Sequence, residues 1–211
     1  MPKLILTFSL AVLLAACATL QRAPVITDLN HYKRADYFKT HAQGAFNVTG
    51  TFEDFSMDGV LIVKKLDEND FEVSLLSAGM FQVLKATVTE EGIAWQYLFK
   101  DVDNTFVRAR ITQLLDLLLM PKKCHKIGVK NGEAVVTCKG IRAKERFFYQ
   151  NNEVYPVRAQ TVTALNTADL SYADYVPADA DGNLLPHHLT YKDGKITLYL
   201  TLISLSGPRA Q

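Results

Sequence analysis

Residues 71–83 read Phe-Glu-Val-Ser-Leu-Leu-Ser-Ala-Gly-Met-Phe-Gln-Val, and this stretch decides the fold. Apolar and polar side chains alternate from Phe71 to Leu75, a loop with Gly79 follows, and the alternation resumes from Phe81. Successive side chains of a strand point to opposite faces of a sheet, so this pattern predicts a strand, a loop and a second strand. We therefore expect an antiparallel sheet that buries one face.

The same alternation extends outward on both sides of this stretch. Short apolar runs are separated by charged or glycine-bearing turns such as Asp193-Gly194, which is typical of an antiparallel meander. Together with the hairpin described below, the predicted sheet has about eleven strands. The other runs that read as strands are 45–52, 57–65, 81–88, 93–98, 143–149, 154–165, 172–176, 189–192 and 195–202.

The apolar segment 109–120 interrupts the alternation and predicts a helix that ends before Pro121. Four apolar residues in it have the i, i+3, i+4, i+7 spacing of one helical face: Ile111, Leu114, Leu115 and Leu118. Leu117, Leu119 and Met120 widen the apolar surface beyond a single stripe, so the helix should be buried on much of its circumference. We expect it to cross the concave side of the sheet. A further helix is expected over residues 28–42.

A hairpin is predicted at Asn131-Gly132, the strongest short turn signal in the chain. A two-residue turn there pairs Lys130 with Glu133. This register leaves Cys124 and Cys138 one step from facing each other, and a bulge near the open end of the hairpin would bring them together. In an oxidising compartment the two cysteines most simply form a disulfide; the alternative is two separate buried thiols.

The N-terminus reads as a targeting segment. Lys3 is followed by a short apolar run that ends Leu-Leu-Ala-Ala-Cys-Ala-Thr at residues 13–19, too short for a membrane span of roughly 20 apolar residues. The ending resembles the lipobox of bacterial lipoproteins. This resemblance implies a signal peptide over residues 1–16, a lipidated Cys17 and a tether over residues 17–27. The alternative is an ordinary cleavage site with a chance cysteine.

The residue after the cysteine is Ala18 rather than Asp. In the enterobacterial sorting rule that comes with the lipoprotein resemblance, Asp at this position retains a lipoprotein in the inner membrane. The expected location is therefore the outer membrane, with a lipid anchor and a body that faces the periplasm. The membrane is then the first expected partner of the protein.

Charge and motifs exclude several functional classes. The chain has 23 basic and 22 acidic side chains, and the predicted signal removes Lys3, so no basic excess favours nucleic acid. There is no nucleophile elbow, zincin helix, phosphate-binding loop or Cys-x-x-Cys pair. Residues 179–183 are similar to a calcium loop, but the glycine comes too early and Thr190 stands in place of the closing glutamate. No enzymatic activity, metal or cofactor is expected.

These features together resemble the LolA/LolB-like superfamily of lipoprotein carriers and receptors. The resemblance rests on the lipobox, the expected front helix over 28–42, the long antiparallel sheet, the apolar helix before Pro121, and the segments 71–83 and 184–191. It implies an α+β fold, mostly antiparallel, in which a curved incomplete barrel surrounds an apolar cavity closed by helices on its concave side. One domain over residues 28–205 and a tail over 206–211 are expected. The Pro-Leu-Gly loop of the receptor members is absent, since residues 77–80 read Ser-Ala-Gly-Met.

Two functions are compatible with this sequence. In the first, the cavity binds an acyl chain of a lipid or lipoprotein cargo. In the second, the same residues form a filled core, and the protein is a non-enzymatic accessory protein that docks a partner in the envelope. The cavity residues expected in the first case are Ile111, Leu114, Leu115 and Leu118 on the helix, Phe81 and Trp95 in the wall, and Met80 at the mouth.

Overall fold

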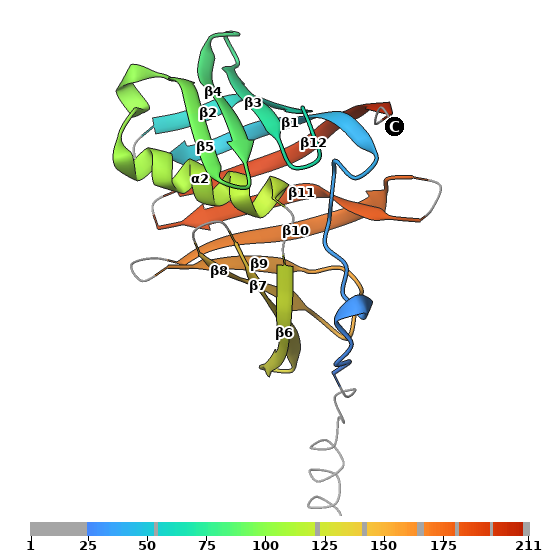
Figure 1. Cartoon of the computed structure of the whole chain (residues 1–211). Coiled ribbons are helices and arrows are strands. Elements are labelled where there is room, and N and C mark those ends of the chain that lie inside the picture. The colour runs from blue at the N-terminus through green and yellow to red at the C-terminus, as the bar shows by residue number, and fades with distance from the viewer. Residues whose placement is uncertain are drawn as a thin grey trace, which may run out of the picture.

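Twelve strands form one antiparallel sheet that curves around one α-helix (Figure 1). The computed structural model describes residues 25–52, 55–120, 123–140, 143–163, 167–179, 182–194 and 196–208. The strands are β1 (His41–Phe52), β2 (Phe55–Lys65), β3 (Phe71–Ser77), β4 (Gln82–Thr89), β5 (Gly92–Leu98), β6 (Lys123–Lys130), β7 (Glu133–Lys139), β8 (Lys144–Tyr149), β9 (Arg158–Val162), β10 (Thr167–Pro177), β11 (Leu184–Asp193) and β12 (Ile196–Pro208).

The strand order is β5-β4-β3-β2-β1-β12-β11-β10-β9-β8-β7-β6. The sheet therefore consists of two meanders, β1–β5 and β6–β12, which are joined where the first strand pairs with the last, from His41↔Pro208 to Phe52↔Ile196. Because β5 and β6 are both edges, the sheet is an incomplete barrel. The predicted fold class is confirmed, with twelve strands where about eleven were expected.

Helix α2 (Thr105–Leu119) crosses the concave side of the sheet, as predicted. It begins four residues before the expected start, because the side chain of Asn104 accepts a hydrogen bond from the Val107 N–H at 2.9 Å and caps the helix. An ion pair attaches the helix to β11: Arg110 lies 2.6 Å from the fully buried carboxylate of Asp193. This contact fixes how α2 lies against the sheet.

The helix expected over residues 28–42 was a wrong prediction. Only a 3₁₀ turn, η1 (Leu29–His31), forms there, and residues 32–40, which we call the strap, run without regular structure. Six residues cover about 9 Å in a helix but about 20 Å when extended. The extended path allows the ring of Tyr32 to contact Tyr149 on β8, at 4.6 Å between centroids, while Phe38 contacts Phe71 on β3 at 5.3 Å.

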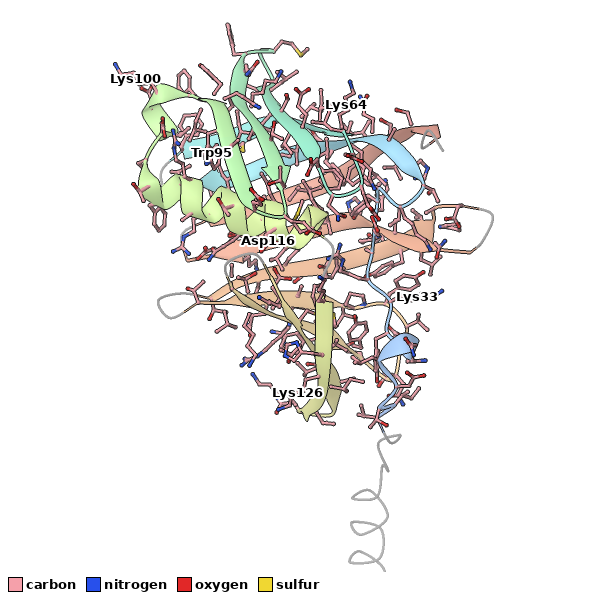
Figure 2. The ribbon with its side chains drawn as sticks, in the orientation of Figure 1. Lys33, Lys64, Trp95, Lys100, Asp116 and Lys126 are labelled. Carbon is pink, nitrogen blue, oxygen red and sulfur yellow. A yellow bond between two sulfur atoms is a disulfide. The ribbon has the colours of Figure 1, made fainter. Side chains whose placement is uncertain are left out.

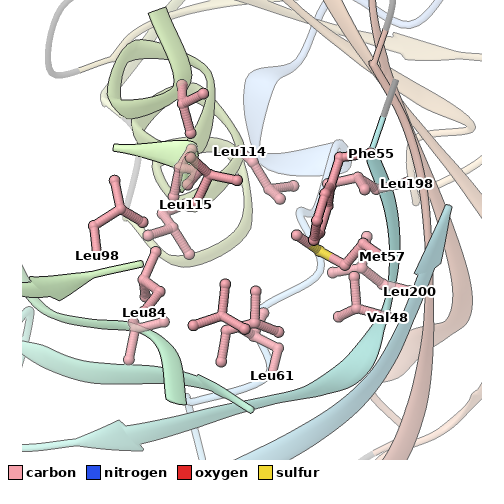
Figure 3. A pocket seen from close by; sticks show the side chains of 16 residues that line it. Val48, Phe55, Met57, Leu61, Leu84, Leu98, Leu114, Leu115, Leu198 and Leu200 are labelled. Atoms are coloured by element: carbon pink, nitrogen blue, oxygen red, sulfur yellow. The ribbon is translucent and has the colours of Figure 1, made fainter. Parts of the chain in front are cut away.

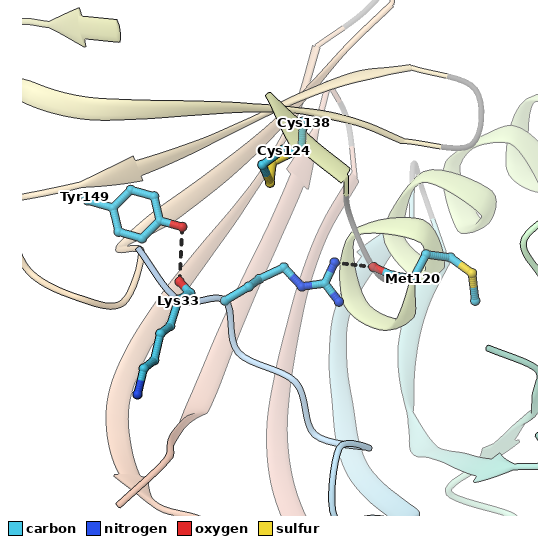
Figure 4. Close-up of a disulfide and its surroundings, with 6 residues drawn as sticks. Lys33, Met120, Cys124, Cys138 and Tyr149 are labelled. Atoms are coloured by element: carbon cyan, nitrogen blue, oxygen red, sulfur yellow. Dashed lines mark hydrogen bonds between the residues drawn. A yellow bond between two sulfur atoms is a disulfide. The ribbon is translucent and has the colours of Figure 1, made fainter. Parts of the chain in front are cut away.

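The β6–β7 hairpin has the predicted turn and contains the expected disulfide (Figure 4). Asn131 and Gly132 both have positive φ, 53° and 83°, and Lys130 pairs with Glu133. The register shifts between Cys124 and Lys126, so an extra residue is accommodated and Cys124 lies directly opposite Cys138. The bulge thus supplies the one-residue step that the turn alone left open.

Candidate apolar ligand site

An apolar hollow lies between helix α2 and the half of the sheet that contains β1–β5 (Figure 3). All 16 residues that line it are apolar. The sheet contributes Val48 from β1, Leu61 from β2, Leu75 from β3, Leu84 from β4, and Leu198 and Leu200 from β12. The opposite side is formed by Ile111, Leu114 and Leu115 of α2. The hollow is therefore enclosed by a sheet and a helix that were both expected to be its walls.

The hollow is narrow inside and wider toward solvent. Its enclosed free volume is about 50 Å³, whereas the space counted out to the surface is about 650 Å³. Pockets that bury a small ligand usually hold about 300–1,000 Å³. The enclosed volume is well below this range, so a long chain fits only if the helix or the side chains of the walls move outward. Phe55, which is 48% exposed, borders the hollow.

Two glycines permit close contacts in the strands around the hollow. A Cβ atom at Gly50 would lie 2.1 Å from the Thr197 carbonyl oxygen, and one at Gly59 would lie 2.1 Å from the Leu76 carbonyl oxygen. Any side chain at either position would collide with the backbone of the neighbouring strand. Glycines of this kind mark tight bends in strongly curved sheets. They are consistent with the curvature that wraps β1–β5 around α2.

Three of the seven predicted cavity residues line the hollow: Ile111, Leu114 and Leu115. Leu118, one turn further along the same face, is 4% exposed and packs in the core beyond the hollow. Trp95 on β5 is partly buried, and the guanidinium of Arg108 lies over its ring at 5.4 Å from the centroid. Leu118 and Trp95 are therefore next to the site rather than in its lining.

Met80 and Phe81 do not line the hollow either. They lie in the β3–β4 loop and are 73% and 76% exposed. The Ser77 N–H donates to the Phe81 carbonyl oxygen at 2.8 Å, which closes the loop before β4 begins at Gln82. Phe81 thus belongs to the turn, not to the strand in which the alternation placed it. The two side chains form an exposed apolar tip.

None of the lining residues from the sheet, which come from β1–β5 and β12, was predicted from the sequence. Met57 and Leu61 lie two positions to either side of Gly59, on the same face of β2. Their alternation with polar or outward residues could have identified them as residues of the concave face. Leu198 and Leu200 were not recognisable in the same way. They join the site only because β12 pairs with β1, about 150 residues earlier in the chain, and strand alternation carries no information about such a pairing.

The lining contains no charged or hydrogen-bonding side chain. The nearest ion pair in sequence is Asp103–Arg108, whose carboxylate and guanidinium lie 2.6 Å apart at the start of α2. Its hydrogen bonds lower the pKa of Asp103 and raise the pKa of Arg108, so both groups stay charged at the surface. The hollow itself has no acid, base or nucleophile. The residues that line it offer apolar contacts only.

The described part of the chain has neither a membrane-spanning helix nor a cluster of metal-binding side chains. In the described ranges no helix combines the length and the apolar character needed to cross a bilayer. Nor do any three histidine, cysteine, aspartate or glutamate side chains of the described part of the chain gather in a way that could hold a metal ion. The apolar hollow therefore remains the candidate site.

The fold was compared with known proteins. No protein-family model and no curated protein sequence matches the chain. A LolA superfamily protein from Nitrosomonas europaea has a similar crystal structure, with a TM-score of 0.59 and 10% identity over 86% of this chain and 94% of that protein. An outer membrane lipoprotein-sorting protein domain from Vibrio parahaemolyticus has a TM-score of 0.42 and 9% identity over 81% and 85%. The first likeness shows that the chain has a LolA/LolB-like fold.

Proposed function

We propose that this chain is a lipid-anchored outer-membrane protein that binds an acyl chain of a lipid or lipoprotein in the hollow beneath α2. The observation that carries this proposal is the entirely apolar lining, contributed by five strands of one meander, by β12 and by the helix. A ligand in this site meets no hydrogen-bond donor or acceptor. Its bound part is therefore aliphatic, and each buried methylene contributes about 0.8 kcal/mol.

The location within the cell is part of the same proposal. Cys17 and the signal over residues 1–16 lie outside the described residues, so the lipobox alone supports them. The domain over 28–205, the tether over 17–27 and the tail over 206–211 likewise remain predictions. The fold is consistent with this assignment, because it is similar to that of a LolA superfamily protein.

A second function is favoured by one observation, the small enclosed volume of about 50 Å³. If the walls never separate, the hollow is a slightly loose core. The protein would then be a non-enzymatic accessory protein of the envelope. The exposed tip of Met80 and Phe81 would be a contact for its partner.

Uptake of a fluorescent fatty acid separates the two functions. We expect the wild-type protein to bind the probe and Leu114→Phe to lose binding, because the larger ring occupies the hollow. Leu118→Phe is the matched control: it makes the same change one turn along the helix, outside the lining, so a folded variant should still bind. A wild-type protein that takes up no probe supports the accessory function instead.

The anchor is tested with Cys17→Ser in cells. Lipidation of the thiol normally precedes cleavage in lipoproteins, so this variant should accumulate as uncleaved precursor without attached lipid. The measurement is mass spectrometry of the protein extracted from membranes. If the variant is cleaved before residue 17 and remains on the membrane as the wild type does, Cys17 is not the anchor.

A further inference from the structure

The outer face of strands β6–β8 carries a cluster of cationic side chains. On β7, Ala134, Val136 and Cys138 belong to the core, so the residues between them point to the opposite, outer face. The same holds on β8, where Phe147 and Tyr149 face the core. Six cations lie at outward positions of the three strands. Lys130, beside the turn, pairs with Glu133. We call the other five the basic face: Lys123, Lys126, Lys139, Lys144 and Arg146.

The strand register aligns these cations in two rows. In the first row Lys123 lies opposite Lys139, which lies opposite Lys144. In the second row Thr137 separates Lys126 from Arg146. Like charges that face each other across neighbouring strands destabilise a sheet. A row of three lysines therefore costs folding free energy unless an anion from outside the domain neutralises it.

The bulge at the disulfide contributes to this alignment. It places an extra residue, His125, between Cys124 and Lys126. As a result Lys123 pairs with Lys139 and Lys126 pairs with Thr137, and both partners are outward positions. The two β6 lysines therefore lie on one face, although an odd number of steps along the chain would place them on opposite faces of a regular strand. Without the extra residue, one of the two lysines would face the core side of the hairpin. The register that permits the disulfide therefore also completes the basic face.

No ion pair neutralises these five side chains within the described residues. The acids of the neighbouring strands are directed elsewhere. Glu133 and Asp169 lie 3.8 and 3.6 Å from the guanidinium of Arg158, and Glu145 is fully buried on the core side of β8. Four of the five cations are solvent-exposed and Arg146 is half-buried. The chain as a whole is nearly neutral, so this concentration of charge is local.

Strand β6 begins at Lys123 beside the end of α2 and runs toward the end of the molecule where the chain approaches from the proposed anchor. Turn η1 lies against β6, and the described chain begins just before it, at Val25 (Figure 1). Eight Cα–Cα steps separate Val25 from Cys17, which is at most about 28 Å. A bilayer that holds Cys17 is thus within short reach of β6. Figure 2 shows Lys126 at this end, and Lys64 and Lys100 at the other.

We propose that the basic face docks on the anionic headgroups of the bilayer that holds the anchor. This inference rests on the proposed lipidation but not on acyl-chain binding. A cation close to an anionic membrane surface strengthens binding about fivefold, and the effect is screened within about 8 Å at physiological salt. Docking through β6–β8 holds the apolar hollow at the far end of the molecule, away from the anchoring surface.

Lysine acetylation, read by peptide mass spectrometry, tests the docking. The full lipidated protein is reconstituted in phosphatidylcholine vesicles with or without phosphatidylglycerol and recovered by flotation. Lys123, Lys126, Lys139 and Lys144 should be labelled about fivefold less in the anionic vesicles, and high salt should restore the labelling. Lys64 and Lys100, which are exposed at the far end, are the internal controls and should not change. Equal labelling in both kinds of vesicle would overturn the proposal.

Two double variants sharpen the result. Lys139→Gln with Lys144→Gln should abolish the protection of Lys126, whereas Lys64→Gln with Lys100→Gln should leave it intact. Flotation separates a failure of the proposed anchor from a failure of the proposed docking face.

Protein that lacks the lipid should still float with anionic vesicles but not with neutral vesicles, and this result supports docking through the basic face. If that protein floats with neither kind of vesicle, the docking proposal is contradicted.

Discussion

The two meanders of the sheet bury their concave faces differently. The β1–β5 meander packs aliphatic side chains against α2 and leaves a hollow lined without polar atoms. The β6–β12 meander is filled by aromatic rings, among them Phe147, Tyr149, Tyr172 and Tyr191, which are all at most 9% exposed. Aliphatic side chains make no directional bonds, so no such bond holds the lining of the hollow in place. Tyrosines with bonded hydroxyls fix the second interior.

We call the β6–β12 meander the filled half, and hydrogen bonds from tyrosine hydroxyls hold its interior in place. Tyr149 donates to the Lys33 carbonyl oxygen at 3.1 Å, and Tyr37 donates to the Pro186 carbonyl oxygen at 2.7 Å (Figure 4 for Tyr149). Burial raises the pKa of both phenols, so they stay neutral donors. Arg34 of the strap also donates to the carbonyl oxygen of Met120, just after α2. The strap therefore connects the filled half to the end of the helix that lies furthest from the hollow.

The largest expected effect comes from emptying the filled half. Phe147→Ala should lower the free energy of unfolding by about 3–5 kcal/mol, because a ring that is 1% exposed is removed from close packing. Phe55→Ala at the edge of the hollow should cost about 1 kcal/mol or less, since that ring is half in solvent. Urea unfolding followed by circular dichroism measures both. Equal losses would mean that the two halves are packed alike.

The disulfide should have the next largest effect, and it should be confined to stability. Cys124→Ser with Cys138→Ser opens a loop with a sequence separation of 14, which should cost about 3 kcal/mol. Fatty-acid uptake should not change, because no residue of β6 or β7 lines the hollow. A large loss of uptake in protein that is still folded would show that the two halves are coupled.

Overpacking should distinguish two turns of the same helix. Leu118→Phe introduces a ring into close packing and should lower stability by about 1–3 kcal/mol. Leu114→Phe places the same ring at the hollow and should cost less than about 1 kcal/mol, because space is available there. Thermal unfolding of the two variants side by side provides the measurement. If Leu114→Phe is the more destabilising of the two, the hollow is a filled core.

The smallest effect is expected at the beginning of α2. Asn104→Ala removes the acceptor for the Val107 N–H and should cost about 1 kcal/mol. Val107 lines the hollow, so fraying there should also make the site more accessible. Asn104→Asp keeps an acceptor and is the control. Hydrogen exchange of the first helical turn should increase in the alanine variant alone.

Local pattern was sufficient for most of this fold. Alternation located the strands, the i, i+3, i+4, i+7 spacing located α2, and Asn131-Gly132 set the register that leads to the disulfide. These features depend on neighbours within a few residues, which the sequence displays directly. The cap at Asn104 was also present in the sequence, but its position ahead of a less apolar first turn concealed the start of the helix.

Long-range geometry explains what was not predictable. The strap was expected to be helical because Leu29, Tyr32 and Tyr37 suggest a loose apolar face, but its contacts with both meanders require an extended chain. The candidate site was identified through the helix alone. Its sheet side depends on which strands become neighbours and on a turn that moves Phe81 out of β4. Neither follows from the period of the side chains.

The pairing of β1 with β12 has a consequence for biosynthesis. Among the described strands β1 is made first and β12 last, so one edge of β1 has no partner until β12 is available. An open strand edge promotes aggregation, so the emerging chain needs protection throughout this interval. Until β12 pairs with β1, the two meanders of the described sheet are not joined.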